Sequence, residues 1–222
     1  MGIKQENFIE FVDKICYNSI KNKRKERMVM KKAKRFMTLV VTAALIFSFG
    51  GCGKGSSDKE DSKESAQVKD ALEILTNVWD RYDEEKKFPV AGGDYDNISE
   101  NAPGKFDVSN TEALRSVLIV PEDAAGMVDD GASLMHAMNA NTFTSGAFHM
   151  AEAADRGEFT DALKEAVLNN QWMCGFPEEF IVYGVGDEYV VSAFGKSDTI
   201  GYFKEQLLKQ YPSAEALVEE SL

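Results

Sequence analysis

Two apolar runs flank a glycine-containing connection in Phe180-Ile181-Val182-Tyr183-Gly184-Val185-Gly186-Asp187-Glu188-Tyr189-Val190-Val191-Ser192-Ala193-Phe194. Both runs are rich in Val, Ile, Tyr and Phe, the residue types that favour β-strands. A short connection that contains glycine between two such runs is typical of a β-hairpin. The segment therefore predicts a pair of antiparallel strands.

A helix is predicted on the C-terminal side of this hairpin. Ser197 is a suitable N-cap, and Ile200, Phe203 and Leu207 recur at helical spacing. Pro212 is expected to end the helix, because proline disfavours helical geometry in the residue before it. A short acidic tail follows, for which a helix is one option.

The residues before the hairpin predict a second pair of strands and another helix. Residues 133–138 and 142–150 flank the turn 139–141, although the Met and Ala content of the first run would also suit a helix. Apolar residues at helical spacing predict a helix over about 158–170. This order of elements predicts an α+β fold, in which a small, mostly antiparallel sheet has helices packed on one face.

The first part of the domain is predicted to contain helices joined by a long loop. Apolar residues recur at helical spacing over 67–84, and the Pro, Gly and Asn residues of 88–105 indicate a loop. Ser109-Asn110-Thr111-Glu112 has the form of a capping box, and Pro121 suits the first turn of a short helix over 122–127. We expect 67–222 to form a single α+β domain.

Residues 28–51 have the composition of a signal peptide. The basic run Lys31-Lys32-Ala33-Lys34-Arg35 precedes an apolar run from Met37 to Phe49. A basic start, an apolar stretch of about 7–15 residues and a small-residue cleavage site are typical of secretory signal peptides. The apolar run is shorter than the roughly 20 residues that a membrane-spanning helix needs.

The sequence Phe49-Gly50-Gly51-Cys52 resembles the lipobox of bacterial lipoproteins, in which a cysteine follows two small residues. The resemblance implies cleavage before Cys52 and attachment of diacylglycerol to its sulfur. Phe49 departs from the family, which usually has Leu, Val or Ile there. Because a single acyl chain binds a membrane only marginally, two or three chains would be needed to hold the protein on the outer face of the cell membrane.

The residues around this cysteine complete the predicted organisation. We expect 52–66 to be the lipidated cysteine and a flexible polar linker, since 53–66 contains no large apolar side chain. Residues 1–27 have two open interpretations, an over-extended start or an extended basic n-region. In either case Cys16 has no role in the mature protein.

The C-terminal half is similar in pattern to a broad group of small Gram-positive lipoproteins that have no assigned activity. The similarity rests on Phe148-His149-Met150, on the helix around Phe159 and on the two apolar runs of the 180–194 hairpin. It implies an extracytoplasmic domain and supplies no catalytic residue.

Charge is distributed unevenly along the 222 residues. Residues 1–50 hold 11 basic and 4 acidic side chains, whereas 51–222 hold 14 basic and 33 acidic ones. So acidic a domain would be repelled by phosphates, which excludes nucleic acid as a partner. The expected partners are the membrane, through the lipid anchor, and a cationic peptide, a divalent cation or a membrane protein complex.

A reactive thiol is the first candidate for chemistry. Trp172-Met173-Cys174-Gly175-Phe176-Pro177 resembles a thioredoxin-type turn, but Met173 separates the Trp from the Cys and no second Cys follows. Dithiol exchange needs a resolving thiol. Cys174 could act alone as a nucleophile if a histidine lowered its pKa, and a buried, inert thiol is the alternative.

The histidines and the carboxylates offer two candidate metal sites. If the 139–141 turn is centred on Ala140, His136 and His149 lie on opposite faces of the sheet and roughly 17 Å apart, which excludes a shared zinc site. The acidic segment from Asp94 through Asp96 to Glu100 lacks the Gly and the final Glu of an EF-hand. Its alternatives are a weak calcium site and a solvated turn.

Two functional hypotheses remain. The sequence contains no G-x-S-x-G, no phosphate-binding loop and no complete G-x-G-x-x-G, so we expect no cofactor. The first hypothesis is a lipid-anchored extracytoplasmic protein with a non-catalytic binding or accessory role. The alternative is a small extracytoplasmic enzyme that uses Cys174 or a carboxylate pair.

Overall fold

A computed structural model describes residues 68–138, 142–152, 154–173 and 175–222. The predicted signal peptide, the lipidated Cys52 and the linker lie outside the described residues. Within the described residues the chain has the predicted α+β fold, built on an eight-stranded sheet whose neighbouring strands are all antiparallel.

The helices begin and end close to their predicted boundaries. The described helical segments are α2 (Ala71–Asp80), α3 (Thr111–Val117), the 3-10 turn η1 (Ala125–Met127), α4 (Arg156–Leu168) and α5 (Ser197–Gln210). Asp70 and Asn110 cap α2 and α3 by accepting hydrogen bonds from backbone amides. Ser197 is the first residue of α5 rather than its cap, and the Glu178 carboxylate accepts a hydrogen bond from its N–H.

Both predicted strand pairs are confirmed. The strands are β1 (Val90–Gly93), β2 (Ile98–Glu100), β3 (Gly104–Phe106), β4 (Val128–His136), β5 (Thr144–Met150), β6 (Glu179–Val185), β7 (Tyr189–Gly195) and β8 (Glu215–Ser221). Their order in the sheet is β2-β1-β4-β5-β7-β6-β8, and β3 also pairs with β4.

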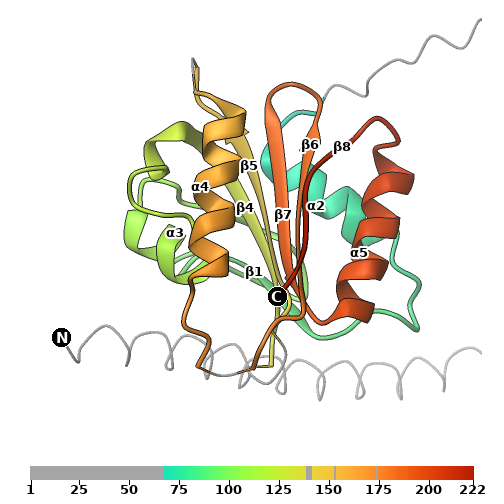
Figure 1. Ribbon diagram of the computed structural model, residues 1–222. Coiled ribbons are helices and arrows are strands. Elements are labelled where there is room, and N and C mark those ends of the chain that lie inside the picture. Colours follow the sequence, from blue (N-terminus) through green and yellow to red (C-terminus); the bar gives the residue numbers. More distant parts are fainter. Residues whose placement is uncertain (1–67, 139–141, 153, 174) are drawn as a thin grey trace, which may run out of the picture. The chain divides into compact units, whose positions relative to one another are not determined.

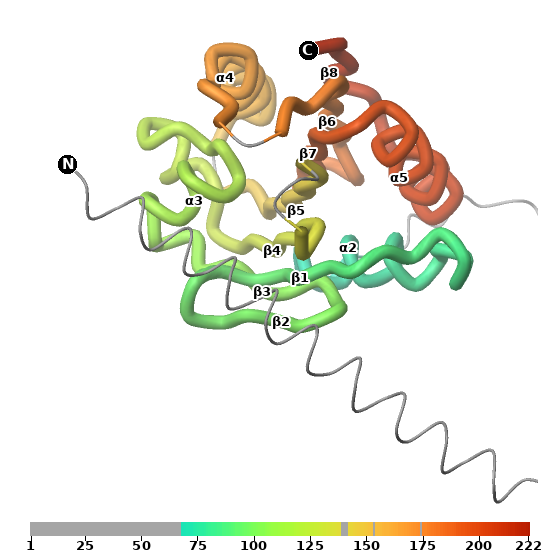
Figure 2. The backbone as a smooth tube through the Cα atoms, turned by 90° about the horizontal axis from the view of Figure 1, so that it is seen from below, coloured from blue at the N-terminus to red at the C-terminus, as the bar shows by residue number. Residues whose placement is uncertain are grey.

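Helices cover both faces of the sheet, which corrects the prediction that they pack on one. Helices α2 and α5 lie on one side of the strands, and α3 and α4 lie on the other (Figures 1 and 2). Along β6, Phe180 and Val182 enter the α3–α4 core, whereas Ile181 and Tyr183 enter the α2–α5 core. A strand buried on both faces needs no polar alternation, which explains the continuous apolar run in the sequence.

Two segments for which no strand was predicted form strands in the structure. The predicted loop 88–105 includes β1, β2 and the start of β3, and the acidic tail forms β8 at the edge of the sheet. On β8, Glu220 binds Lys164 of α4 and Glu219 binds Lys204 of α5. Charged side chains are a common way to protect an edge strand against pairing with another chain.

The junction of β1 and β3 depends on glycine. A Cβ atom on Gly92 would lie 2.1 Å from the Gly104 nitrogen, and one on Gly104 would lie 2.4 Å from the Gly93 nitrogen. The two backbones therefore meet where a side chain on either would overlap the other. This close approach lets β1 and β3 both pair with β4 along the same edge.

Candidate functional site

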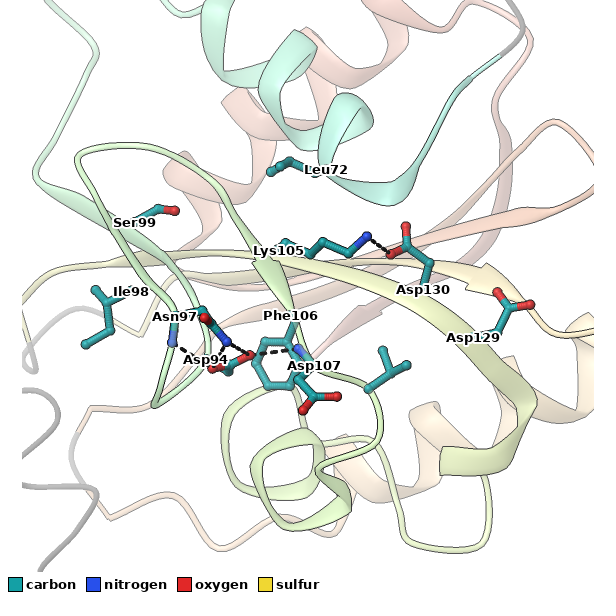
Figure 3. A pocket seen from close by; sticks show the side chains of 11 residues that line it. Leu72, Asp94, Asn97, Ile98, Ser99, Lys105, Phe106, Asp107, Asp129 and Asp130 are labelled. Carbon is teal, nitrogen blue, oxygen red and sulfur yellow. Dashed lines mark hydrogen bonds and ion pairs between the residues drawn. The ribbon is translucent and has the colours of Figure 1, made fainter.

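An open groove of about 710 Å³ lies beside the start of β4. It is bordered by α2, by the segment that contains β2 and β3, and by β4 (Figure 3). Its lining combines four aspartates and one lysine with four apolar and two uncharged polar residues. They are Asp94, Asp107, Asp129, Asp130, Lys105, Leu72, Ile98, Phe106, Val108, Asn97 and Ser99. Its size is within the range of small-molecule sites, roughly 300–1,000 Å³.

Asp94 organises one wall of the groove. The side chain is 3% exposed and accepts hydrogen bonds from the backbone amides of Asp96, Asn97 and Asp107 at 2.9, 2.9 and 2.7 Å. These bonds close the turn between β1 and β2 and fasten it to the end of β3. A buried carboxylate that accepts several backbone hydrogen bonds has its lone pairs engaged in the fold.

The structure does not assemble the predicted calcium candidates into a site. Asp94 lines the groove, whereas Asp96 and Glu100 do not. No three His, Cys, Asp or Glu side chains in the described part of the chain are placed to hold a metal ion. Asp94 therefore has a structural role in the turn.

Asp130 joins three elements at the floor of the groove. One oxygen of its carboxylate lies 3.1 Å from the Lys105 Nζ of β3, and the other accepts a hydrogen bond of 3.0 Å from the Ala71 N–H at the start of α2. The hydrogen bond to Asp130 raises the pKa of Lys105. The Asp130 side chain is only 20% exposed.

Asp129 forms a side-chain contact that sequence reasoning missed. Its carboxylate lies 2.5 Å from the His149 Nδ1, and the His149 ring packs edge-on against Tyr189 at 4.9 Å. The register of β4 against β5 shifts between Val128 and Asp130, so Asp129 is the extra residue of a β-bulge. Bulges re-aim side chains, and this one brings Asp129 to His149, whose cross-strand partner is Asp130.

The two histidines lie on the same face of the sheet, contrary to the prediction. His149 pairs with Asp130 rather than with Gly131, and the His136 N–H donates to the Phe143 carbonyl. This one-residue difference in register reverses the predicted faces. The six residues between Asp130 and His136 still separate the histidines by roughly 20 Å, so a shared metal site remains excluded.

The aromatic side chains outside the groove divide between two cores and the surface. Trp79, Tyr82 and Phe88 pack together in the α2–α5 core, and Trp172 packs against Phe194 at 5.0 Å. These aromatic side chains do not line the groove. Phe176 is 65% exposed. Cys174 and Cys52 lie outside the described residues.

Comparisons with family models and with solved structures supply no function for this chain. No family model matches the chain, and no solved structure matches it. Of the helices in the described ranges, none has the length and apolar character required to cross a membrane. The geometry of the groove is therefore the starting point for function.

Proposed function

We propose that the protein is a lipid-anchored binding protein on the outer face of the cell membrane, which uses the groove to bind a cationic ligand. The observation that carries the ligand class is the imbalance of charge in the groove, where four aspartates line it together with one lysine. The lipobox-like sequence that ends at Cys52 supports the anchor.

The exposed carboxylates determine the chemistry of the ligand. The Asp107 side chain accepts hydrogen bonds from the Ser109 hydroxyl and amide, which lower its pKa and keep it charged. The Asp129 side chain is 53% exposed at the groove. Lys105 already pairs with Asp130, and one oxygen of Asp129 contacts His149, so Asp107 and the other oxygen of Asp129 are the acceptors offered to a ligand.

Apolar side chains favour a peptide over a bare cation. Leu72, Ile98 and Val108 line the groove beside the aspartates. A peptide with alternating basic and apolar side chains could contact both sets, whereas a divalent cation would need several convergent carboxylates. The groove therefore best fits a short cationic, amphipathic peptide.

The ligand is tested with a fluorescent peptide of alternating Lys and Leu, titrated against the full chain at low salt and at high salt. We expect D107N/D129N to weaken binding about tenfold at low salt, if each carboxylate contributes about 0.7 kcal/mol. The matched control is E158Q/E165Q, which removes the same charge from α4 and should leave binding unchanged. An equal loss of affinity in both variants would show that the peptide binds by general electrostatic attraction and not in the groove. Tighter binding of Ca²⁺ than of the peptide would favour a metal ligand.

The anchor is tested separately. Cells that express the chain are fed labelled palmitate, and the parent protein should incorporate the label whereas Cys52→Ala should not. Label in both proteins, or in neither, would contradict attachment at Cys52. The enzyme hypothesis with Cys174 as the nucleophile predicts that this thiol reacts with an alkylating reagent faster than a free thiol at neutral pH. An inert Cys174 would reject that form of the hypothesis.

A further inference from the structure

His136 lies at the opposite end of β4 from the groove, inside an aromatic cluster. Its ring stacks on Phe88 with centroids 4.9 Å apart and an interplanar angle of 7°. Phe88 in turn packs edge-on against Trp79 and Phe143, each at 5.4 Å. The ring of His136 therefore covers one side of the residue that closes the α2–α5 core at this end.

One ring nitrogen holds the backbone that follows β4. The Met138 N–H donates a hydrogen bond of 3.1 Å to the His136 Nδ1. A nitrogen that accepts a hydrogen bond carries a lone pair, so the imidazole is neutral and its proton is on Nε2. Protonation would place two N–H groups against each other and break this bond.

Three chain segments meet at His136. Its N–H donates to the Phe143 carbonyl, and its cross-strand partner on β1 is Val90. The next residue, Ala137, donates to the Pro89 carbonyl at 2.8 Å. A change at this ring therefore affects the 88–90 segment, the end of β4 and the start of β5 together.

The surroundings of the ring disfavour a positive charge. Burial lowers the pKa of His136. Among the described residues, its contacts named above, Phe88, the Met138 amide, Val90 and Phe143, carry no negative charge that would stabilise an imidazolium. The attraction of a cation for the Phe88 ring is smaller than the loss of hydration and of a hydrogen bond.

The titratable side chains around Phe88 and β1 are Tyr82, Tyr202, Lys87 and Glu84, and Glu100 lies on β2 opposite Ala91. Tyr82 packs on Phe88 from the end of α2, and Tyr202 of α5 packs on Tyr82 at 4.9 Å. Burial raises the pKa of the Tyr82 hydroxyl, which keeps it neutral. Lys87 binds Glu84 at 2.7 Å, so that carboxylate already has a cation.

We propose that His136 is an acid-operated latch, which holds Phe88 and Met138 against the sheet when neutral and releases both when protonated. Release would uncover Trp79 and Phe143, which are buried in the closed form. The Met138 side chain, whose amide the latch holds, is already 52% exposed. Mild acid would therefore open an apolar surface at the end of β4 remote from the groove. This device is independent of the proposed ligand.

The test is amide hydrogen exchange of the full chain at pH 7.5 and pH 5, corrected for the intrinsic effect of pH on exchange. We expect the exchange rates of Ala137 and Met138 to rise at least tenfold at pH 5 in the parent. His136→Gln cannot be protonated and should show the same corrected rates at both pH values. His149→Gln is the matched control and should behave like the parent.

Two results would overturn the latch. The first is equal protection of Ala137 and Met138 at both pH values in the parent, and the second is a rise in His136→Gln as large as in the parent. If that variant does not fold, NMR titration of the parent decides. The His136 ring and the Met138 amide must then titrate with one midpoint, and different midpoints would reject the proposal.

Discussion

The two histidines on one face of the sheet have opposite surroundings. His136 stacks on an aromatic ring and accepts a hydrogen bond, whereas His149 contacts the Asp129 carboxylate at 2.5 Å. His136 is the last residue of β4, and His149 of β5 pairs with Asp130 near the other end of β4. One end of this strand closes an apolar core and the other carries a network of charges. The comparison shows that the neighbours supplied by other strands, rather than the residue type, determine what a histidine does.

A one-residue irregularity produces the charged end. Asp129 and Asp130 are adjacent and would point to opposite faces in a regular strand. The bulge between Val128 and Asp130 lets Asp129 reach His149 while Asp130 binds Lys105 and the start of α2. The apolar end needs no such irregularity, because its contacts come from side chains packed across the sheet.

The largest expected effect is at the apolar end. Phe143→Ala should lower the free energy of unfolding by about 3–5 kcal/mol, because Phe143 is 1% exposed and packs on Phe88 and Phe203. Urea unfolding measures this loss. Phe176→Ala removes the same side chain from a 65% exposed position and should change stability by less than about 0.5 kcal/mol. Similar losses in both variants would contradict the assignment of the core.

The next effect is at the charged end. Asp130→Ala should destabilise the domain by about 1–3 kcal/mol, because the Ala71 N–H and the Lys105 ammonium both lose their partner. Thermal unfolding followed by circular dichroism gives the change, and Asp187→Ala in the exposed β6–β7 turn is the control. A stability equal to that of the parent would show that water replaces both contacts at no cost.

The dependence of stability on pH separates the two histidines. The folded-state pKa of His136 lies below its unfolded value of about 6.5. As the pH falls through this value, the unfolded chain therefore takes up a proton at His136 more readily than the folded chain does. Stability should therefore fall as the pH drops through about 6.5 in the parent. His136→Gln should lose this part of the dependence, whereas His149→Gln should retain it. Unfolding curves in guanidinium chloride at several pH values measure the difference, and identical profiles for the three proteins would refute it.

The smallest effect is expected for Asp129→Asn. The Asp129 side chain is 53% exposed, and a contact between a carboxylate and a histidine at such an exposed position contributes about 0–1 kcal/mol, of which any charge–charge part is screened by salt. The free energy of unfolding of the variant should thus differ from that of the parent by less than about 1 kcal/mol at low salt. At 1 M salt the difference should be too small to measure. A larger, salt-independent loss in urea unfolding would show that the bulge itself depends on this pair.

The helices and the central hairpins could be predicted because their signals are local. Helical spacing located α2, α4 and α5, and the apolar runs located β6 and β7. Helices on both faces were implied by Phe180-Ile181-Val182-Tyr183, where no polar residue alternates with the apolar ones. Such a run favours a strand buried on both faces, whereas the order of the elements alone predicts helices on one face.

The other strands could not be predicted because tertiary contacts override their local preferences. β1 contains two glycines, which disfavour strands, and β8 is rich in Glu and Ala, which favour helices. Pairing with β6 and the ion pairs from Lys164 and Lys204 hold β8 extended. The candidate site was missed for the same reason, since Lys105 and Asp130 meet only through the register of β3 on β4.

The glycine junction of β1 and β3 has a consequence for genetic screens of this protein. A library of all single substitutions should be depleted of every replacement at Gly92 and Gly104, since even alanine would place a methyl carbon within 2.1 or 2.4 Å of a backbone nitrogen. Two intolerant positions close to an acidic groove would mimic the signature of a ligand-binding pair. Depletion at these two positions would reflect only that two backbone segments of the chain lie too close together for a Cβ atom to fit between them.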